Sequence, residues 1–166
     1  EIWLATLDRS APPRRLTENG DEVSFAGAEI VFRELDAKAN YLTRIGRDGT
    51  ARQRIVETPI IDKGDSSPDG VWVAAIFSGE GEQRSAPGTT IRSIRGGPPT
   101  SICPLYCPVT FSADGRWLYV TLLGIGQQPG SSAKILALRM GDNGELPTSL
   151  RTVVDAAFAG TLPPDQ

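Results

Sequence analysis

The side chains able to do chemistry in this 166-residue chain are few, because the sequence contains no histidine. Imidazole is the usual general base and a frequent zinc ligand. A Ser-His-Asp catalytic triad and a His-ligated zinc site are therefore excluded within these residues. Any chemistry would have to use carboxylates, tyrosine, lysine or the cysteines Cys103 and Cys107. Two thiols without histidine make zinc unfavourable, and their spacing differs from the C-x-x-C pattern of redox pairs.

Acidic side chains gather in two stretches, Asp62–Asp69 and Asp8–Glu22. Two carboxylates held about 5–9 Å apart can hydrolyse glycosides, but most loop carboxylates are simply solvated. The stretch Asp65–Gly70 resembles the beginning of a calcium loop, with oxygen-bearing side chains at its first, third and fifth places, although Ile76 stands where an EF-hand requires glutamate. We therefore expect neither a catalytic pair nor a metal site, and no cofactor.

The composition narrows the class of partner. Lys+Arg is 17 and Asp+Glu is 20, so the net charge is -3 and no basic excess favours nucleic acid. A hydrophobic content of 39% is typical of a globular protein, and no apolar run approaches the roughly 20 residues of a membrane helix. The glycine-rich stretch Gly124–Gly130 departs from the spacing of a nucleotide-binding loop. The opening EIWLATLDRS indicates a chain that is processed or cut from a longer one.

The elements that must position these groups are short strands. The 18 glycines and 13 prolines divide the chain into short segments that are apolar or alternate in polarity, which is typical of strands. Val71–Phe77 and Trp117–Leu123 are apolar on both faces. Strands of this kind must be covered on both sides, so sheets stacked face to face are expected.

One turn occurs twice, as SSPDGVW (Ser66–Trp72) and FSADGRW (Phe111–Trp117), with four shared residues each 45 positions apart. In a Ser-x-Asp-Gly turn, aspartate bonds to the backbone two residues on and glycine relieves a positive φ. We expect the two tryptophans to begin the following strands and to pack between sheets. The predicted turn and core residues are Asp69, Gly70, Trp72, Asp114, Gly115 and Trp117.

A second kind of segment alternates with these hairpins and contains a strand, a turn rich in Gly, Asp or Pro, and another strand. One repeat is then four antiparallel strands in about 45 residues, the period of a β-propeller blade. The predicted fold is an all-β propeller segment of about three and a half blades, and a closed four-blade ring is the alternative. The predicted units are a half blade at 2–17, blades at about 22–56, 59–102 and 107–154, and a tail at 155–166.

The repeated turns, with IWLATLD and RRLT inside Ile2–Thr17, resemble the repeats of TolB-like proteins, a WD40-like (PD40-type) propeller family of bacteria. The resemblance covers about Ile2–Val154, except that Asp-Gly is missing between Phe25 and Ile30. It implies a non-catalytic module that binds a protein or small ligand at loops on one face, within a larger exported or membrane-anchored protein. The alternative is the propeller domain of a prolyl-oligopeptidase-type serine peptidase whose catalytic domain lies outside this chain.

The resemblance also implies an extracytoplasmic location, in the periplasm or on the outer face of the membrane. In that setting a disulfide between Cys103 and Cys107 is favoured. Pro104, Pro108 and the position between two blades suggest a bend that would bring the two cysteines into range. Two reduced, buried thiols are the alternative.

Overall fold

The computed structural model describes residues 1–77, 88–103, 106–122, 134–150 and 153–154. Their strands pair only in the antiparallel sense. The strands are β1 (Ile2–Leu4), β2 (Arg14–Thr17), β3 (Gly20–Ala26), β4 (Glu29–Leu35), β5 (Asn40–Gly46), β6 (Gln53–Arg54), β7 (Ile60–Ser66), β8 (Trp72–Phe77), β9 (Gly88–Ser93), β10 (Thr100–Cys103), β11 (Val109–Phe111), β12 (Trp117–Leu122) and β13 (Lys134–Arg139).

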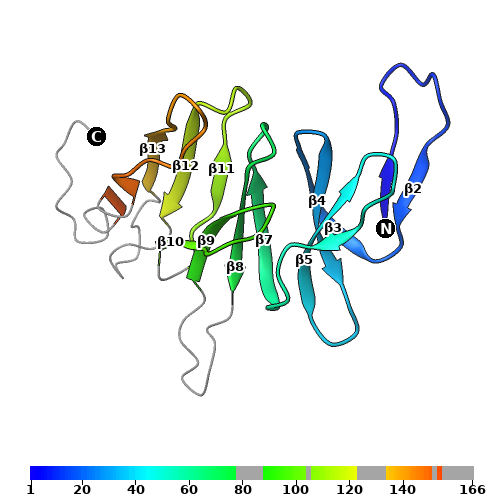
Figure 1. Cartoon of the computed structure of the whole chain (residues 1–166), viewed down its shortest axis with the longest axis horizontal. Coiled ribbons are helices and arrows are strands. Elements are labelled where there is room, and N and C mark those ends of the chain that lie inside the picture. The colour runs from blue at the N-terminus through cyan, green and yellow to red at the C-terminus, as the bar shows by residue number, and fades with distance from the viewer. Residues whose placement is uncertain (78–87, 104–105, 123–133, 151–152, 155–166) are drawn as a thin grey trace.

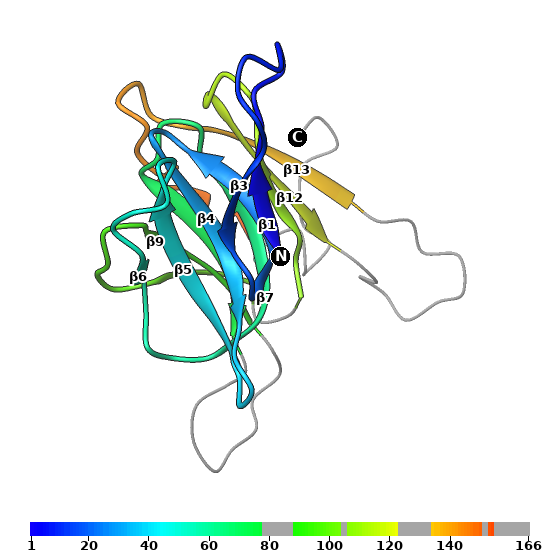
Figure 2. The ribbon, with the colours of Figure 1, turned by 90° about the vertical axis from the view of Figure 1, so that its right-hand side faces the viewer.

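Consecutive strands pair into four groups: β1–β2, β3–β6, β7–β10 and β11–β13. One bridge, Asn40 to Ile60, links the second group to the third at a strand end. Figure 1 shows the groups side by side along the long axis of the molecule, and Figure 2 shows them stacked behind one another from the N-terminal side. The fold is therefore all-β, with the successive small sheets of a β-propeller, as predicted. The exact limits and number of the blades stay predictions.

The first two strands of each longer group follow the same register. Phe25 pairs with Ile30 in β3–β4, and Phe111 pairs with Leu118 in β11–β12. The corresponding pair in β7–β8 is Ser66 with Val73. Strand β7 also lies between β3 and β11, so the first strands of the three groups are neighbours. Phe25 and Ile30 thus occupy the places of Phe111 and Leu118, across a turn that is two residues shorter.

The hydrophobic core formed by the described residues has three layers, each between two neighbouring groups. Ile2 packs with Ile30 and Phe32 between β1–β2 and β3–β5. Val31 and Val73 belong to the next layer, between β3–β5 and β7–β9. The third layer joins β8–β10 to β11–β13 and is the largest. Stability therefore depends mainly on contacts between successive sheets, as in other stacked repeats.

Two expectations about the last sheet need correction. The segment after β13 was predicted to add a short strand, but Leu150, Val153 and Val154 have helical backbone. Proline lacks the N–H that a strand would donate, and Pro147 stands at the beginning of this turn, where Leu150 N–H donates to the Pro147 carbonyl. Leu150 and Val154 are four residues apart, so one helical face carries both into the core.

The second correction concerns the strand β12, which was expected to be covered on both faces. Leu118, Val120 and Leu122 are buried on one face, whereas Trp117 is 39% exposed on the other. No described sheet follows β13, so that second face is not covered by a described sheet. Trp117 therefore does not pack between two described sheets, and its packing against a following sheet stays a prediction.

Candidate binding site at the repeated turns

The two Ser-x-Asp-Gly turns share three side-chain hydrogen bonds, and in the first turn Ser67 Oγ also accepts the Val71 N–H at 3.2 Å. The Ser67 hydroxyl donates to Asp69 Oδ1, which also accepts the Val71 N–H at 3.0 Å. The Trp72 N–H donates to Ser67 Oγ at 2.8 Å and closes the turn. Gly70 has a φ of 77°, in the left-handed region where glycine avoids steric strain.

The second turn has the same three shared bonds. The Ser112 hydroxyl donates to Asp114 Oδ1 at 2.6 Å, and the Arg116 N–H donates to the same oxygen at 3.0 Å. The Trp117 N–H donates to Ser112 Oγ at 2.9 Å, and Gly115 has a φ of 71°. These bonds, that from Ser112 first, lower the pKa of Asp114, so its carboxylate stays charged at neutral pH.

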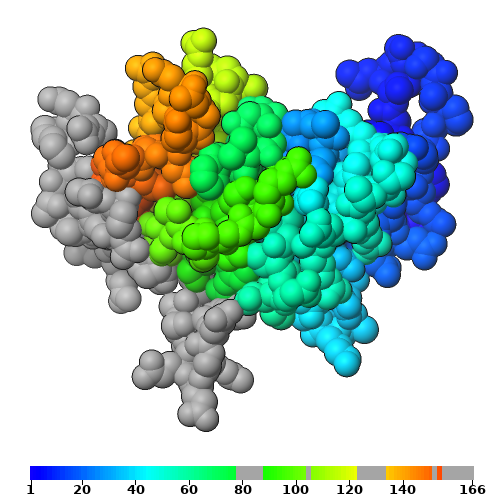
Figure 3. All heavy atoms as spheres, viewed as in Figure 1, coloured from blue at the N-terminus to red at the C-terminus, as the bar shows by residue number. Residues whose placement is uncertain are grey.

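The two turns line a hollow of about 740 Å³ at one end of the last two groups of strands. A third turn, which follows β13, completes the lining. In Figure 3 the yellow-green and orange residues of the last group stand at the upper edge, beside the green residues of the preceding group. The residues that line the hollow are Pro68, Asp69, Ala113, Asp114, Gly115, Arg116, Arg139, Met140, Gly141, Asp142, Asn143 and Gly144.

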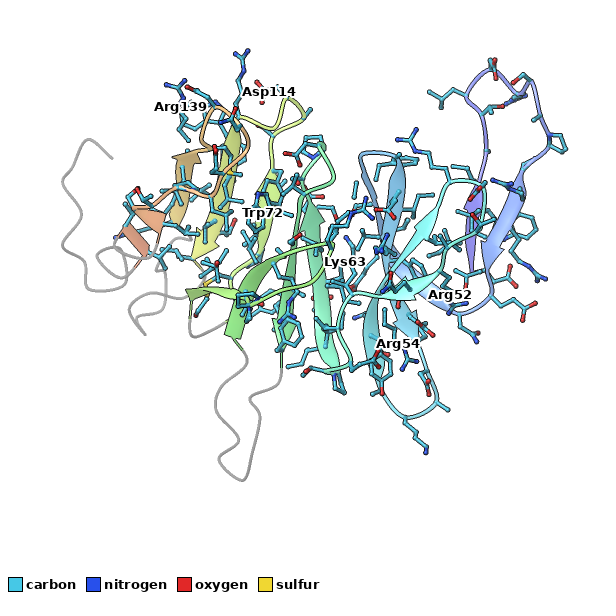
Figure 4. All side chains as sticks on the ribbon, in the orientation of Figure 1. Arg52, Arg54, Lys63, Trp72, Asp114 and Arg139 are labelled. Atoms are coloured by element: carbon cyan, nitrogen blue, oxygen red, sulfur yellow. A yellow bond between two sulfur atoms is a disulfide. The ribbon has the colours of Figure 1, made fainter. Side chains whose placement is uncertain are left out.

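The charged groups of the hollow are only partly engaged. The Arg116 side chain is 79% exposed, and its Nε is 3.9 Å from Asp114 Oδ2. The Arg139 side chain is 74% exposed and lies 3.5 Å from Asp142 Oδ1. Exposed pairs at such distances contribute little to stability, so these guanidinium groups are available to a ligand. Figure 4 shows Arg139 and Asp114 at the same end of the last group of strands.

The junction between the β3–β4 turn and the first repeated turn corresponds in position to the hollow, but it is closed. The Gly27 N–H donates to the Pro68 carbonyl at 3.1 Å. A Cβ placed on Gly70 would lie 2.7 Å from the Ala26 carbonyl oxygen, whereas one on Gly115 would lie 3.3 Å from Pro68 Cγ. The missing Asp-Gly in the β3–β4 turn therefore coincides with tight packing, and the hollow lies where two full turns meet.

The two repeated tryptophans have different surroundings. Trp72 is half-buried against the largest core layer, and its indole N–H donates to the Gly144 carbonyl at 2.7 Å. Trp72 lies in the interior of the molecule in Figure 4, between the third and fourth groups of strands. Gly144 has a φ of 78°, and a Cβ there would lie 2.6 Å from Asp69 Oδ2. Trp72 thus bonds the turn of the next sheet to its own sheet, and Asp69 lies close to Gly144 in that turn.

A charged cluster that sequence reasoning missed lies between the first strands β3 and β7. The Lys63 side chain is almost fully buried, with Nζ 2.7 Å from Ser24 Oγ and 2.6 Å from the Gly64 carbonyl. Burial lowers the Lys63 pKa from 10.5 to about 8, against the opposing effect of Asp65 and other nearby carboxylates. No periodicity in IIDKGDS distinguishes a buried lysine from a solvated one, so sequence carried no signal for this residue.

Carboxylates on the exposed side of this cluster meet at Arg33. Its guanidinium group is 2.8 Å from Asp21, 2.8 Å from Glu22 and 3.3 Å from Asp62. Burial and a side-chain bond to Asp62 raise the Glu22 pKa, whereas the bond to Arg33 lowers that of Asp21. The structure therefore brings together members of both predicted acidic stretches, but as a network that joins two sheets.

Among the described residues, no group of three or more His, Cys, Asp or Glu side chains could hold a metal ion. The calcium-like stretch Asp65–Gly70 is spread over a strand end and a turn, where Asp65 Oδ2 accepts the Phe111 N–H at 3.0 Å. No described helix is long and apolar enough to span a membrane. The glycine-rich stretch Gly124–Gly130 and the predicted tail at 155–166 lie outside the described residues.

Cys103 and Cys107 form a disulfide in the structure, with their Cα atoms 6.5 Å apart. Both cysteines are buried in the largest core layer, beside β11. The Cys107 N–H donates to Thr89 Oγ1 at 2.9 Å, and the neighbouring Tyr106 hydroxyl donates to Asp62 at 3.0 Å. The disulfide therefore ties the end of β10 to the beginning of the last group of strands.

The fold is that of a β-propeller, and comparison with known structures specifies it as TolB-like. TolB from Acinetobacter baumannii aligns with a TM-score of 0.58 and 17% identity, over 87% of this chain and 36% of that one. The β-propeller domain of the Trilobed protease from Pyrococcus furiosus aligns with a TM-score of 0.49 and 13% identity, over 76% of this chain and 41% of that one. No protein-family model matches the sequence, and no curated protein matches it. The chain thus spans less than half the length of both structures, and the likeness concerns the fold.

Proposed function

We propose that this chain is a non-catalytic binding module that receives a protein or small ligand at the hollow between its repeated turns. The observation that carries the proposal is the hollow itself, about 740 Å³ in volume and lined by three turns with arginine and aspartate side chains. Concave sites with a few convergent polar groups are the usual places for ligands. The turns are held rigidly from within, so the surface is preorganised for binding.

The hydrogen bonds and the pKa values of the polar groups favour a binding role over catalysis. Asp69 and Asp114 use one carboxylate oxygen each to hold their own turns. The chain has no histidine, and Lys63, the amine with a strongly lowered pKa, is only 8% exposed and lies outside the hollow. Recognition by arginine and aspartate needs no group with a pKa near neutrality, whereas general acid–base catalysis does.

The binding proposal is tested by reversing one charge in the hollow. The immobilised chain and its Arg116→Glu variant are used to capture proteins from an extract of the source organism, with quantitative mass spectrometry as readout. Lys38→Glu is the matched control, because Lys38 is an exposed residue outside the hollow and undergoes the same change of charge. We expect at least one protein to be lost about tenfold with Arg116→Glu and retained with Lys38→Glu. Equal capture by all three proteins would exclude the hollow as the binding face.

We also propose an extracytoplasmic location, because disulfides persist mainly in oxidising compartments. The Cys103–Cys107 disulfide supports this. Intact-mass measurement after alkylation without reductant should show no added label, and two labels after reduction and unfolding. Rapid labelling of both cysteines without reductant would contradict the proposal.

The peptidase alternative would be favoured by a G-x-S-x-G sequence with a later histidine in the remainder of the reading frame.

A further inference from the structure

Successive hairpins can be joined by a main-chain hydrogen bond at one equivalent position of their turns. Gly27, Pro68 and Ala113 are equivalent, because each lies two residues after the first residue of the corresponding cross-strand pair. The Gly27 N–H donates to the Pro68 carbonyl at 3.1 Å and closes the first junction. The same bond at the second junction would run from Pro68 to Ala113, but proline has no N–H. The sequence of the first repeated turn thus prevents this bond.

The Ala113 carbonyl is consequently an acceptor to which no described residue donates. The two repeated turns share three side-chain hydrogen bonds and the positive φ of their glycines. The Ala113 carbonyl therefore has the orientation within its turn that the Pro68 carbonyl has toward Gly27. Pro68 and Ala113 both line the hollow. A group that enters the hollow can supply the N–H that the chain does not.

Two carboxylate oxygens of the hollow also lack a donor among the described residues. Asp69 and Asp114 each use Oδ1 inside their own turn. No described residue donates to Asp69 Oδ2, and Asp114 Oδ2 is 3.9 Å from Arg116 Nε, beyond hydrogen-bond distance. The lining of the hollow therefore offers three acceptors, two of which belong to carboxylates. A donor that also carries positive charge fits them best.

The rim of the hollow has the opposite preference. The side chains of Arg116 and Arg139 are 79% and 74% exposed, so two cations already stand at its edge. They repel a lone cation and attract a carboxylate. A ligand that suits both regions carries a basic group and an acidic group close together. In a polypeptide these groups can be neighbouring side chains, and no free α-ammonium has to approach the two arginines.

We propose that the hollow binds an arginine side chain of a partner polypeptide that has an acidic residue next to this arginine. The guanidinium group has five N–H donors in one plane, and it donates to the Ala113 carbonyl and to Oδ2 of Asp69 and Asp114. The neighbouring carboxylate binds Arg116 at the rim. The inference rests on the proposed function and deepens it, because it names the partner as a polypeptide and states what the hollow recognises.

The test uses two capped peptides that differ in one group. Acetyl-Gly-Arg-Glu-Gly-amide and its citrulline counterpart are titrated into the ¹⁵N-labelled chain, and the backbone amide resonances of Asp114 and Gly115 are followed. Citrulline keeps the length and the planar end of arginine but has no charge. We expect saturable shifts and about tenfold tighter binding of the arginine peptide. Equal affinities, or the absence of saturable shifts, would overturn the proposal.

Asp114→Asn changes one acceptor and keeps the turn, because Oδ1 can still accept the bonds from Ser112 and Arg116. We expect this variant to bind the arginine peptide about tenfold more weakly and the citrulline peptide no differently. Asp48→Asn is the matched control, since Asp48 is an exposed turn aspartate outside the hollow that also accepts a backbone N–H through Oδ1. Equal affinities of the two variants for the arginine peptide would refute the role of the carboxylate.

Pro68→Ala tests the main-chain acceptor. Alanine at this place supplies the N–H that Gly27 supplies at the first junction, so it competes with the ligand for the Ala113 carbonyl. We expect weaker binding of both peptides, because citrulline also donates through N–H groups. Unchanged binding of both would remove the Ala113 carbonyl from the site.

The acidic neighbour is tested with a third peptide, in which glutamine replaces glutamate. We expect this peptide to bind the wild type about threefold more weakly than the arginine peptide with glutamate, since exposed ion pairs contribute little. Arg116→Glu should bind the glutamine peptide better than the glutamate peptide. Equal binding of the two peptides by both proteins would refute the role of Arg116.

The capture experiment with Arg116→Glu tests the proposed function without any of these peptides. A partner lost with Arg116→Glu, together with equal affinities for the arginine and citrulline peptides, would refute this inference and leave the proposed function intact. Equal capture by the wild type, Arg116→Glu and Lys38→Glu would refute the proposed function, and this inference would fail with it. The two failures therefore give different results.

Discussion

The same turn occupies two environments in this molecule, and the comparison separates what a local sequence determines from what its neighbours determine. Ser66–Trp72 and Phe111–Trp117 share three side-chain hydrogen bonds and their positive φ. Trp72 nevertheless bonds to the turn of the next sheet, while Trp117 is exposed beyond the last described strand. Four residues are thus sufficient to specify the turn, whereas burial of the tryptophan requires a following sheet.

The two junctions between turns show a second difference. The first is closed by a bond from Gly27 to Pro68, and the second opens into the hollow. The β3–β4 turn is shorter by two residues, which permits close contact with the turn that follows it. Repetition of the full turn therefore creates both a structural unit and, between two copies, the hollow that we propose as a binding site.

We expect the largest effect on the free energy of unfolding from substitution of the repeated tryptophans. Trp72→Ala should lower the free energy of unfolding by about 3–5 kcal/mol, because it removes a packed aromatic ring and its partly buried hydrogen bond to Gly144. Trp117→Ala should cost less than about 1 kcal/mol, as is usual for exposed residues. Urea-induced unfolding, followed by circular dichroism, measures both. Equal losses would show that the two faces are covered alike and would remove the contrast between the two turns.

Substitution of the glycines in the two turns tests the difference between the closed junction and the open one. Gly115→Ala should cost about 1–2 kcal/mol, the strain of a left-handed residue with a Cβ. Gly70→Ala should cost about 1–3 kcal/mol more, because its Cβ would meet the Ala26 backbone at 2.7 Å. The difference between the two variants is the informative quantity in chemical denaturation. A difference near zero would mean that the first junction can relax and is not closed.

The buried lysine between β3 and β7 should make the stability of the chain depend on pH. The Lys63 pKa is about 8 in the folded chain and near 10.5 when unfolded, so between these values the unfolded state binds more protons. The free energy of unfolding should therefore rise with pH across this window, by about 3 kcal/mol in all. Measurements at pH 7, 8, 9 and 10 should show the rise.

Lys63→Met is the control for this pH dependence, since the carboxylates Glu22, Asp62 and Asp65 and the tyrosine Tyr106 remain. The difference between wild type and variant isolates the lysine. We expect the variant to lack the rise and to be at least as stable at pH 7, because replacing a buried charge by an apolar side chain is often neutral or stabilising. A parallel pH dependence in both proteins would show that Lys63 keeps an ordinary pKa.

Much of the fold was predictable because it repeats. The period of about 45 residues and the strand-like segments indicate stacked antiparallel sheets, and the structure has them. The end of the last sheet was not predictable in this way, because PTSLRTVV suits a strand or a helix. Burial of Leu150 and Val154 on one helical face decides the outcome, and that depends on tertiary packing.

The candidate site was predictable only in part. The roles of the aspartates and glycines in the turns could be predicted from the sequence, because each role depends on residues of the same turn. The partners of Trp72 and Lys63 are distant in the sequence. Gly144 lies 72 positions after Trp72, and Ser24 lies 39 positions before Lys63. A single sequence does not reveal which distant residues meet, so neither the hollow nor the buried lysine could be foreseen.

The smallest expected effect tests whether the two turns are locally equivalent. Ser67→Ala and Ser112→Ala each remove the hydroxyl that accepts the following tryptophan N–H, at 2.8 and 2.9 Å. Both variants lose the bond to the aspartate and the bond from the tryptophan N–H, and Ser67 loses in addition only long contacts of 3.2 and 3.4 Å. We therefore expect similar losses of about 1 kcal/mol, even though the tryptophans themselves differ greatly. Denaturant unfolding of the two variants and of the double variant is the measurement, and the losses should add, since the turns share no bonds. A loss much greater for Ser67→Ala would mean that the neighbouring sheets stabilise the turn itself, and the division between local sequence and environment would no longer hold.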